Sequence, residues 1–292
     1  MSDPIPVPEL VDGESVEGRA STRSATAAAV RPRRFGAWYI AEHRLLLMRA
    51  YGSTIVGTSI GNPLVYLFAL GVGLASLVQA PLGDGRGGEV SYLAFVAPAL
   101  LASAAVTVAS EEFTYPVLSG FKWNPVFTGA RSAPISSAQI ADGVIIAVIL
   151  RMVATCAIYF AVMLLFGAVP EPLGALGIVS ATLTGLAVGV VIMAYTCTVT
   201  EDKGQMAIIQ RFIITPMFLF SGTFFPLAQL PVYLQWIGWI SPLWHGTELG
   251  RVLAYGLAEP LWLSVVHVVY LLAITVGGWW GARVIMTRRL DA

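Results

Sequence analysis

Six apolar stretches dominate this sequence of 292 residues, and each is long enough to cross a lipid bilayer. A helix of about 18 or more mostly apolar residues can span the hydrocarbon core. The stretches lie at about 53–79, 91–110, 140–168, 174–198, 206–225 and 261–286. Only 12% of the residues are charged, which is roughly half the fraction typical of a soluble domain. The sequence therefore predicts an all-α membrane protein with six transmembrane helices.

The basic residues indicate how these helices are oriented. If the N-terminus is cytoplasmic, all but three of the 17 Lys and Arg residues lie on the cytoplasmic side or at its rim. The exceptions are Arg86, Arg151 and Arg251. Cytoplasmic loops of membrane proteins carry an excess of Lys and Arg, so we expect both termini to be cytoplasmic. The 17 acidic residues balance the basic ones, and we expect no nucleic-acid partner.

The region before the first apolar stretch divides into two parts. Residues 1–30 are rich in Pro, Ser, Thr, Ala and Gly and have too little apolar area to offset the entropy cost of ordering. We expect a disordered cytoplasmic tail there. Residues 31–51 alternate arginines with Trp38, Leu45 and Met48 at helical spacing. This pattern favours an amphipathic interface helix lying on the membrane surface, the alternative being a plain first turn of the following span.

Charged residues near the third apolar stretch are candidate pathway residues. Arg151 lies deep in that stretch, where a charge costs about 3 kcal/mol or more unless it finds a partner or reaches the headgroups. Asp142 is about 180° away around the same helix and cannot pair with it. Arg151 therefore either faces the helix bundle or the substrate path and pairs with an acid such as Glu111 or Glu112, or extends to the inner headgroups.

Residues 226–258 interrupt the apolar pattern before the last stretch. They begin at Pro226 and contain three tryptophans, a residue that prefers the headgroup zone of a bilayer. This order predicts a re-entrant segment on the outer side. His245, Glu248 and Arg251 follow at spacings of three, which places them along one side of a short helix. They could form a proton or metal site, but one His and one carboxylate are too few for a zinc site, and we favour a salt-bridged cluster that closes an outer gate.

Two pairs of glycines are spaced by four residues within apolar stretches. Gly57 and Gly61 lie in the first stretch, and Gly185 and Gly189 lie in the fourth. Small residues at this spacing let helix backbones approach closely in lipid. Cys156 and Cys197 also lie in apolar stretches, and we expect them to be packing residues.

No motif for catalysis or for binding a nucleotide is present. The chain lacks the Gly-x-x-x-x-Gly-Lys-Ser/Thr phosphate loop, a serine elbow, Cys-x-x-Cys and His-Glu-x-x-His. We therefore expect no catalytic, cofactor-binding or metal-binding residues here, and a pump built on this chain must take its energy from a separate ATPase that binds ATP and Mg²⁺. Six spans are also few to enclose a pathway, which favours two copies, or this chain with a paralogue.

Fixed residues between 220 and 251 resemble the end of ABC-2 type permeases. They are Phe-Ser-Gly at 220–222, Phe-Pro at 225–226, Leu-Pro at 230–231, Pro242, Leu243, His245, Glu248 and Arg251. The resemblance is nearest to the nodulation lipo-oligosaccharide exporter permeases, with daunorubicin-type drug efflux permeases as relatives. Residues 62–71 and 92–102 are similar to the first two spans of the same family. The likeness covers nearly the whole chain after residue 33, so 31–292 is identified as an ABC-2 transmembrane domain.

The resemblance implies a role for the cytoplasmic segment 111–139, which is too polar and too rich in prolines to span. In ABC-2 permeases this segment holds the coupling helix that contacts the ATPase subunit. The residues of this sequence that it assigns to coupling are Phe121, Lys122, Trp123, Phe127, Arg131 and Pro134. Gly129 to Ser132 depart from the family pattern, which expects an acid and bulkier residues there. The short charged turn at 198–204 is a solvated loop or a second ATPase contact.

The sequence is thus interpreted as the permease subunit of a bacterial ABC exporter in the cytoplasmic membrane, not an enzyme itself. It would move an amphipathic substrate outward, such as a glycolipid, a lipid-linked saccharide or a hydrophobic drug. Two alternatives are an intramembrane transferase acting on lipid-linked substrates and a membrane scaffold without transport. The transferase is disfavoured because Glu111 and Glu112 are predicted on the inner side, whereas His245 and Glu248 are predicted on the outer side.

Overall fold

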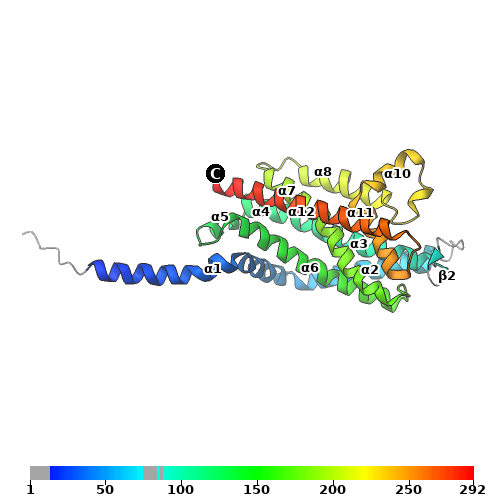
Figure 1. Cartoon of the computed structure of the whole chain (residues 1–292), viewed down its shortest axis with the longest axis horizontal. Helices are drawn as coiled ribbons and strands as arrows, with labels where there is room; N and C mark the ends of the chain where they lie inside the picture. The colour runs from blue at the N-terminus through cyan, green and yellow to red at the C-terminus, as the bar shows by residue number, and fades with distance from the viewer. Residues whose placement is uncertain (1–13, 75–83, 86–87) are drawn as a thin grey trace, which may run out of the picture.

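The computed structural model describes residues 14–74, 84–85 and 88–292 of the chain, and it is an elongated bundle of helices. Helices α4 (Tyr115–Phe121) and α5 (Val126–Arg131) and the C-terminus lie at one end of the long axis, and the short strands and the start of α12 (Leu261–Asp291) lie at the other (Figure 1). We refer to these as the inner and outer ends. The strands β1 (Asp84–Gly85) and β2 (Gly88–Glu89) pair antiparallel.

Four helices are long and apolar enough to cross a membrane. They are α3 (Tyr92–Phe113) with the adjoining α4 (Tyr115–Phe121), α6 (Ser137–Leu165), α7 (Gly177–Thr198) with the 3-10 turn η2 (Pro172–Leu176) before it, and α12 (Leu261–Asp291). They coincide with the stretches predicted at 91–110, 140–168, 174–198 and 261–286. Serine side chains set two of the starts, since Ser91 and Ser136 each accept a hydrogen bond from a backbone N–H of the first turn.

The other two predicted spans are each composed of several helical segments. The first corresponds to α2 (Gly52–Phe68) and the π-helical η1 (Ala69–Leu74), and its predicted last residues, 75–79, lie outside the described residues. The fifth corresponds to a shorter apolar run composed of α8 (Gln205–Ile209), η3 (Gln210–Ile214) and α9 (Thr215–Phe220). The π-helical turn η3 directly precedes Pro216, and such local adjustments let a membrane helix accommodate a proline.

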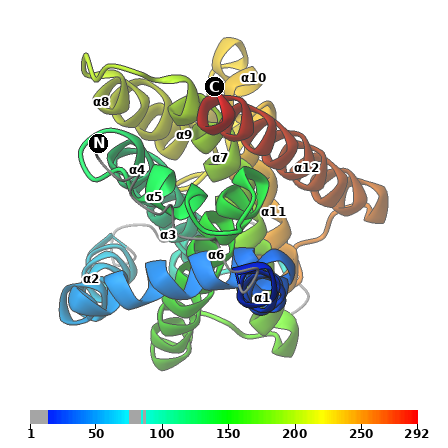
Figure 2. The ribbon, with the colours of Figure 1, turned by 90° about the vertical axis from the view of Figure 1, so that its left-hand side faces the viewer.

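Helix α3 forms the centre of the bundle, because 83% of its most apolar window is buried within the chain, against 11% for α12. Viewed along the long axis, α2 and α8 lie on one side of α3, and α12 lies on the other (Figure 2). The close contact between α3 and α7 depends on glycine. A Cβ on Gly185 would lie 2.7 Å from the Ala105 carbonyl oxygen, whereas Gly57 and Gly61 of α2 have no atom within 4 Å of such a Cβ. The predicted close approach therefore holds for the pair in α7 and not, within this chain, for the pair in α2.

Helix α1 (Glu14–Ala50) is kinked at Phe35, where the backbone leaves the helical region. Its second half lies across the inner end of the bundle (Figure 2), packed so closely on α6 that a Cβ on Gly143 would meet Ala37 and Ile40. The tail predicted over 1–30 differs from the structure, because residues 14–30 continue the helix, and residues 1–13 lie outside the described residues. Alanines at 27–29 favour helix, and extending an existing helix avoids the cost of nucleation.

Three short helices follow α9 at the outer end of the bundle, where the re-entrant segment 226–258 is predicted. They are η4 (Leu227–Gln229), α10 (Val232–Trp239) and α11 (Pro242–Tyr255). Helix α11 ends at Gly256, whose φ of 69° is the left-handed conformation that suits glycine. At the inner end, α4 and α5 (Val126–Arg131) form the turn between α3 and α6.

Candidate translocation site

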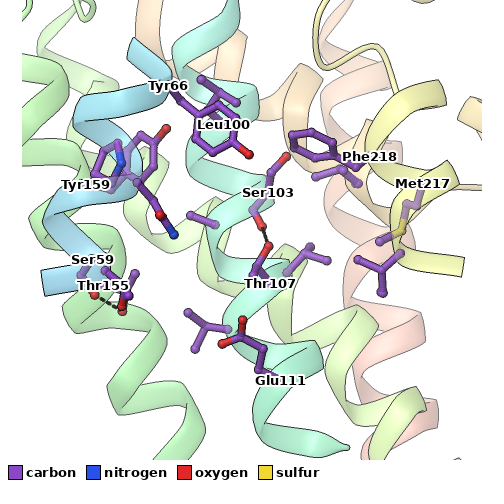
Figure 3. A pocket seen from close by; sticks show the side chains of 18 of the residues that line it. Ser59, Tyr66, Leu100, Ser103, Thr107, Glu111, Thr155, Tyr159, Met217 and Phe218 are labelled. Atoms are coloured by element: carbon purple, nitrogen blue, oxygen red, sulfur yellow. Dashed lines mark hydrogen bonds between the residues drawn. The ribbon is translucent and has the colours of Figure 1, made fainter. Parts of the chain in front are cut away.

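A cavity of about 340 Å³ lies between α2, α3, α6 and the η3–α9 run. Apolar and hydroxyl side chains line it together, with Tyr66 and Leu100 near one end and Glu111 near the other (Figure 3). Arg151 also lines it. The wall therefore combines apolar surface for a chain or ring system with polar atoms in fixed positions, a combination typical of small-molecule sites.

Three hydroxyl groups of the cavity wall already donate their protons within the protein. Thr58, Ser103 and Thr107 each donate to a backbone carbonyl in the preceding turn of their own helix, at 2.8–3.1 Å. Their oxygen lone pairs remain available, because a hydroxyl can accept as well as donate. The Tyr159 hydroxyl is buried and has no hydrogen-bond partner among the described residues. The polar part of the wall can thus mainly accept hydrogen bonds from a ligand.

At the Glu111 end of the cavity, three helices meet at one carboxylate. Glu112 of α3 contacts Arg151 of α6 through Oε1 and Arg44 of α1 through Oε2, the latter at 3.1 Å. Arg151 also lies 4.0 Å from the exposed Glu111. The pairing of Arg151 with Glu112 confirms one of the two arrangements considered for it. The second arginine, Arg44, was not predicted, because on an amphipathic helix it looks like any other residue of the polar face.

This cluster is electrically balanced, since Arg44 and Arg151 face Glu111 and Glu112. Burial lowers the pKa of the Arg44 guanidinium, and the charge and hydrogen bond of Glu112 oppose that shift. On its other side, Arg44 and Glu112 line a larger cavity of about 910 Å³ between α1 and the α4–α5 turn. The cluster therefore stands between the two cavities.

At the outer end, Arg251 is almost completely buried, with 1% of its side chain exposed. It pairs with Glu248 at 2.8 Å, donates to the carbonyls of Gly222 and Phe95 at 2.7 and 3.2 Å, and lies 3.6 Å above the Phe95 ring. Gly222 has a φ of 70°, a conformation open mainly to glycine. These contacts give a physical reason for the Phe-Ser-Gly motif, which presents its glycine carbonyl to Arg251.

His245 does not join Glu248 and Arg251, although the three share one helix. Its ring lies against His267 of α12, with the two Nδ1 atoms 2.7 Å apart. Sequence reasoning did not connect these histidines, since 22 residues and a turn separate them. Among the described residues, no group of three or more His, Cys, Asp or Glu side chains could hold a metal ion.

The candidate acids of a transferase lie far apart. Glu112 and the carbonyl of Phe95 bound by Arg251 lie 17 residues apart on α3, which corresponds to about 25 Å along a helix. Glu111 and Glu112 therefore cannot share one reaction centre with Glu248 and Arg251.

The residues assigned to coupling fall into two groups. Lys122, Trp123 and Pro134 are exposed, although the Trp123 ring also stacks on Tyr115 with the ring centroids 6.4 Å apart. Phe121 and Phe127 pack edge to face, with Phe127 buried and the Arg289 guanidinium 3.9 Å above the Phe121 ring. Arg131 pairs with Asp291 of α12 at 2.9 Å. Lys122, Trp123 and Pro134 present exposed surface that another protein could contact, whereas Phe121, Phe127 and the half-exposed Arg131 hold the turn in place.

The charged residue Asp142 lies near the start of α6. It accepts a hydrogen bond from Trp279 at 2.9 Å and pairs with Arg283 at 3.3 Å, both of α12. Cys156 and Cys197 are free and buried, consistent with packing.

Comparison with known proteins agrees with this architecture. The family model described as ABC-2 type transporter matches residues 37–255, which is most of the chain. Nodulation protein J of Rhizobium leguminosarum bv. viciae is 29% identical over 240 residues, covering 82% of this chain and 88% of the relative. The same protein of Rhizobium meliloti (strain 1021) is 29% identical over 247 residues (82% and 87%), and that of Rhizobium leguminosarum bv. trifolii is 30% identical over 206 residues (68% and 72%). On the strength of the match over residues 37–255, this chain belongs to the ABC-2 type transporter family.

Proposed function

We propose that this chain is the permease subunit of an ABC exporter that moves an amphipathic substrate outward across the bacterial cytoplasmic membrane. In this proposal the chain crosses the membrane six times, with α2–η1 and the run from α8 to α9 as the remaining spans, and both termini are cytoplasmic. The second half of α1 is the interface helix, and residues 226–258 are the outer re-entrant segment. Its partners are a cytoplasmic ATPase that binds ATP and Mg²⁺ and a second permease, either another copy or a paralogue.

The observation that carries the proposal is the cavity between α2, α3, α6 and α9. Its apolar surface suits an acyl chain or a hydrophobic ring system, and its hydroxyl oxygens suit the hydrogen-bond donors of a polar headgroup. A glycolipid, a lipid-linked saccharide or a hydrophobic drug with hydroxyl or amide groups meets both requirements. The ion-pair cluster of Arg44, Glu112 and Arg151 would separate this cavity from the one beneath α1.

The test begins with purification of the tagged chain from its own membranes. We expect a Walker-type ATPase to co-purify, identified by mass spectrometry, and the complex to hydrolyse ATP. Trp123→Ala combined with Lys122→Glu should abolish co-purification with little loss of thermal stability of the permease, because both side chains are exposed and Trp123 only stacks on Tyr115 at the surface.

Trp262→Ala is the matched control, since Trp262 is also exposed but lies at the outer end of α12. It should leave the complex intact. A permease that purifies alone and supports no ATP hydrolysis with any candidate ATPase would overturn the proposal.

A further inference from the structure

Two buried histidines connect the outer segment to the last helix. His245 of α11 and His267 of α12 are 5% and 0% exposed, and their Nδ1 atoms are 2.7 Å apart. The other nitrogen of His245, Nε2, lies 3.0 Å from the carbonyl oxygen of Trp239. The other nitrogen of His267 lies 3.5 Å from Oε2 of Glu259, whose side chain is 7% exposed. The Trp239 carbonyl, His245, His267 and Glu259 thus form a continuous row of contacts from α10 to the loop before α12.

The contacts along this row of four groups require three protons on the histidine nitrogens. A carbonyl oxygen can only accept, so His245 Nε2 must carry a proton. The 2.7 Å contact between the two Nδ1 atoms needs a second proton. The gap between His267 Nε2 and the carboxylate needs a third, because a bare ring nitrogen facing a carboxylate places two lone pairs against each other. Two neutral imidazoles bring only two protons, so the arrangement holds one more.

We propose that this cluster, His245, His267 and Glu259, is a buried binding site for one proton that fastens the outer α10–α11 segment to α12. The third proton lies between His267 and Glu259, and the negative charge of the carboxylate balances it. The inference does not depend on what the protein transports, because it rests on the hydrogen bonds of His245 and on the 3.5 Å ion-pair contact between His267 and Glu259.

The surroundings favour that location of the proton. Burial, and then the neighbouring His267, lower the pKa of His245 to about 4, so His245 is the acceptor in the contact between the rings. Burial alone would raise the pKa of Glu259, but the nearby His267 and the hydrogen bond from Ser264 bring it below its ordinary value. The carboxylate form is therefore favoured in the folded protein.

The remaining neighbours of the two rings carry no charge at neutral pH. The Trp244 ring contacts His245 and His267 edge to face, at centroid distances of 4.9 and 5.1 Å. Tyr270 of α12 stacks on His245 at 4.0 Å, and its hydroxyl donates to the carbonyl of Ile240. Loss of the proton would leave the negative charge of Glu259 uncompensated in this packed setting, facing the lone pair of His267 Nε2. The fastening should therefore weaken at acidic pH, when Glu259 is neutralised.

Nitrogen NMR of the full-length chain in lipid bilayers, with ¹⁵N-labelled histidine, reads this proton directly. The sequence contains three histidines, so a His43→Gln variant leaves only the signals of the pair. At neutral pH we expect one neutral ring and one ring with both nitrogens protonated. Two neutral rings in the otherwise native chain would overturn the proposal without any further variant.

A Glu259→Gln variant then tests whether Glu259 is the group that balances the charged histidine ring. An amide cannot balance the positive ring, so both rings should become neutral, and the pH dependence of the thermal unfolding midpoint attributable to the site should be lost. Glu171→Gln is the control, since Glu171 also lies in a loop between helices at the outer end and has no ion pair among the described residues. It should keep the charged ring. A charged ring that persists in a folded Glu259→Gln variant would also overturn the assignment.

Discussion

Glu112 is the residue on which the inner ion-pair cluster depends, because its two oxygens contact arginines from two other helices. Replacing it with Gln leaves Arg44 and Arg151 with only the more distant and exposed Glu111 as a counter-charge. Removing one partner of a buried ion pair typically costs about 3–5 kcal/mol. We therefore expect Glu112→Gln to lower the thermal unfolding midpoint of the purified chain markedly.

Glu111→Gln is the matched control for this substitution. The Glu111 side chain is 58% exposed and lies 4.0 Å from Arg151, and such exposed pairs contribute about 1 kcal/mol or less. Its unfolding midpoint should stay close to that of the unmodified chain. Equal losses from the two substitutions would show that Glu112 has no special role.

These residues also show how far single positions can be predicted from the sequence. A charge deep in an apolar helix needs a partner, so a pairing of Arg151 with Glu111 or Glu112 could be predicted as one alternative. The choice between those acids, and the participation of Arg44, could not, because both depend on how α1 lies across the bundle. The contact between His245 and His267 could not be predicted either, since only the packing of α11 on α12 creates it.

At the scale of elements, the contact between α3 and α7 depends on glycine. A Cβ at Gly185 would lie 2.7 Å from a backbone oxygen of Ala105 and 2.8 Å from the Met152 sulfur, so one of the two helices would have to move. We expect Gly185→Ala to destabilise the purified chain, measured by thermal unfolding in detergent.

Gly57→Ala offers a comparison within the same motif. A Cβ at Gly57 meets no atom of this chain within 4 Å, and Ala is favoured over Gly in a helix by about 1 kcal/mol. This variant should be as stable as the unmodified chain, or more stable. If Gly57→Ala destabilised the isolated chain as much as Gly185→Ala, packing within the bundle could not be the cause.

The elements themselves were largely predictable, because long apolar stretches fix the four helices that can cross a membrane. Their ends could be approached to within a few residues. The helical state of residues 14–30 was missed, since composition indicates whether a segment can bury apolar area but not whether an adjoining helix will extend into it. The π-helical turn before Pro216 was also missed, although the proline showed that the helix must adjust there.

In the turn formed by α4 and α5, buried side chains and exposed side chains should have different roles. Phe127 is buried, and its ring fills the space beside Gly120, so Phe127→Ala should destabilise the permease by about 3–5 kcal/mol, as large-to-small core substitutions do. Trp123→Ala alone loses only an exposed ring stacked on Tyr115, so it should lower the unfolding midpoint much less than Phe127→Ala does and should reduce ATPase binding in a pull-down. A Trp123→Ala variant destabilised as much as Phe127→Ala would show that its ring stabilises the permease rather than a partner contact.

At the scale of the whole molecule, the described cavities and exposed apolar surface indicate how two permeases would meet. The 340 Å³ cavity is bounded by α2 and α9 on the side of α3 opposite α12 (Figure 2). A pathway shared by two copies would have these sides facing each other. Val65 of α2 is 66% exposed on this side, and Val269 of α12 is 58% exposed on the opposite side.

Cysteine cross-linking in native membranes distinguishes the two sides. The natural cysteines, Cys156 and Cys197, are buried and should react little with a flexible bismaleimide. We expect Val65→Cys to yield a cross-linked dimer on a denaturing gel, or a band with a paralogue if the partner differs, whereas Val269→Cys should remain a monomer because its surroundings are lipid. Cross-linking of Val269→Cys but not of Val65→Cys would place the partner on α12, and the cavity would then open toward lipid rather than toward a second permease.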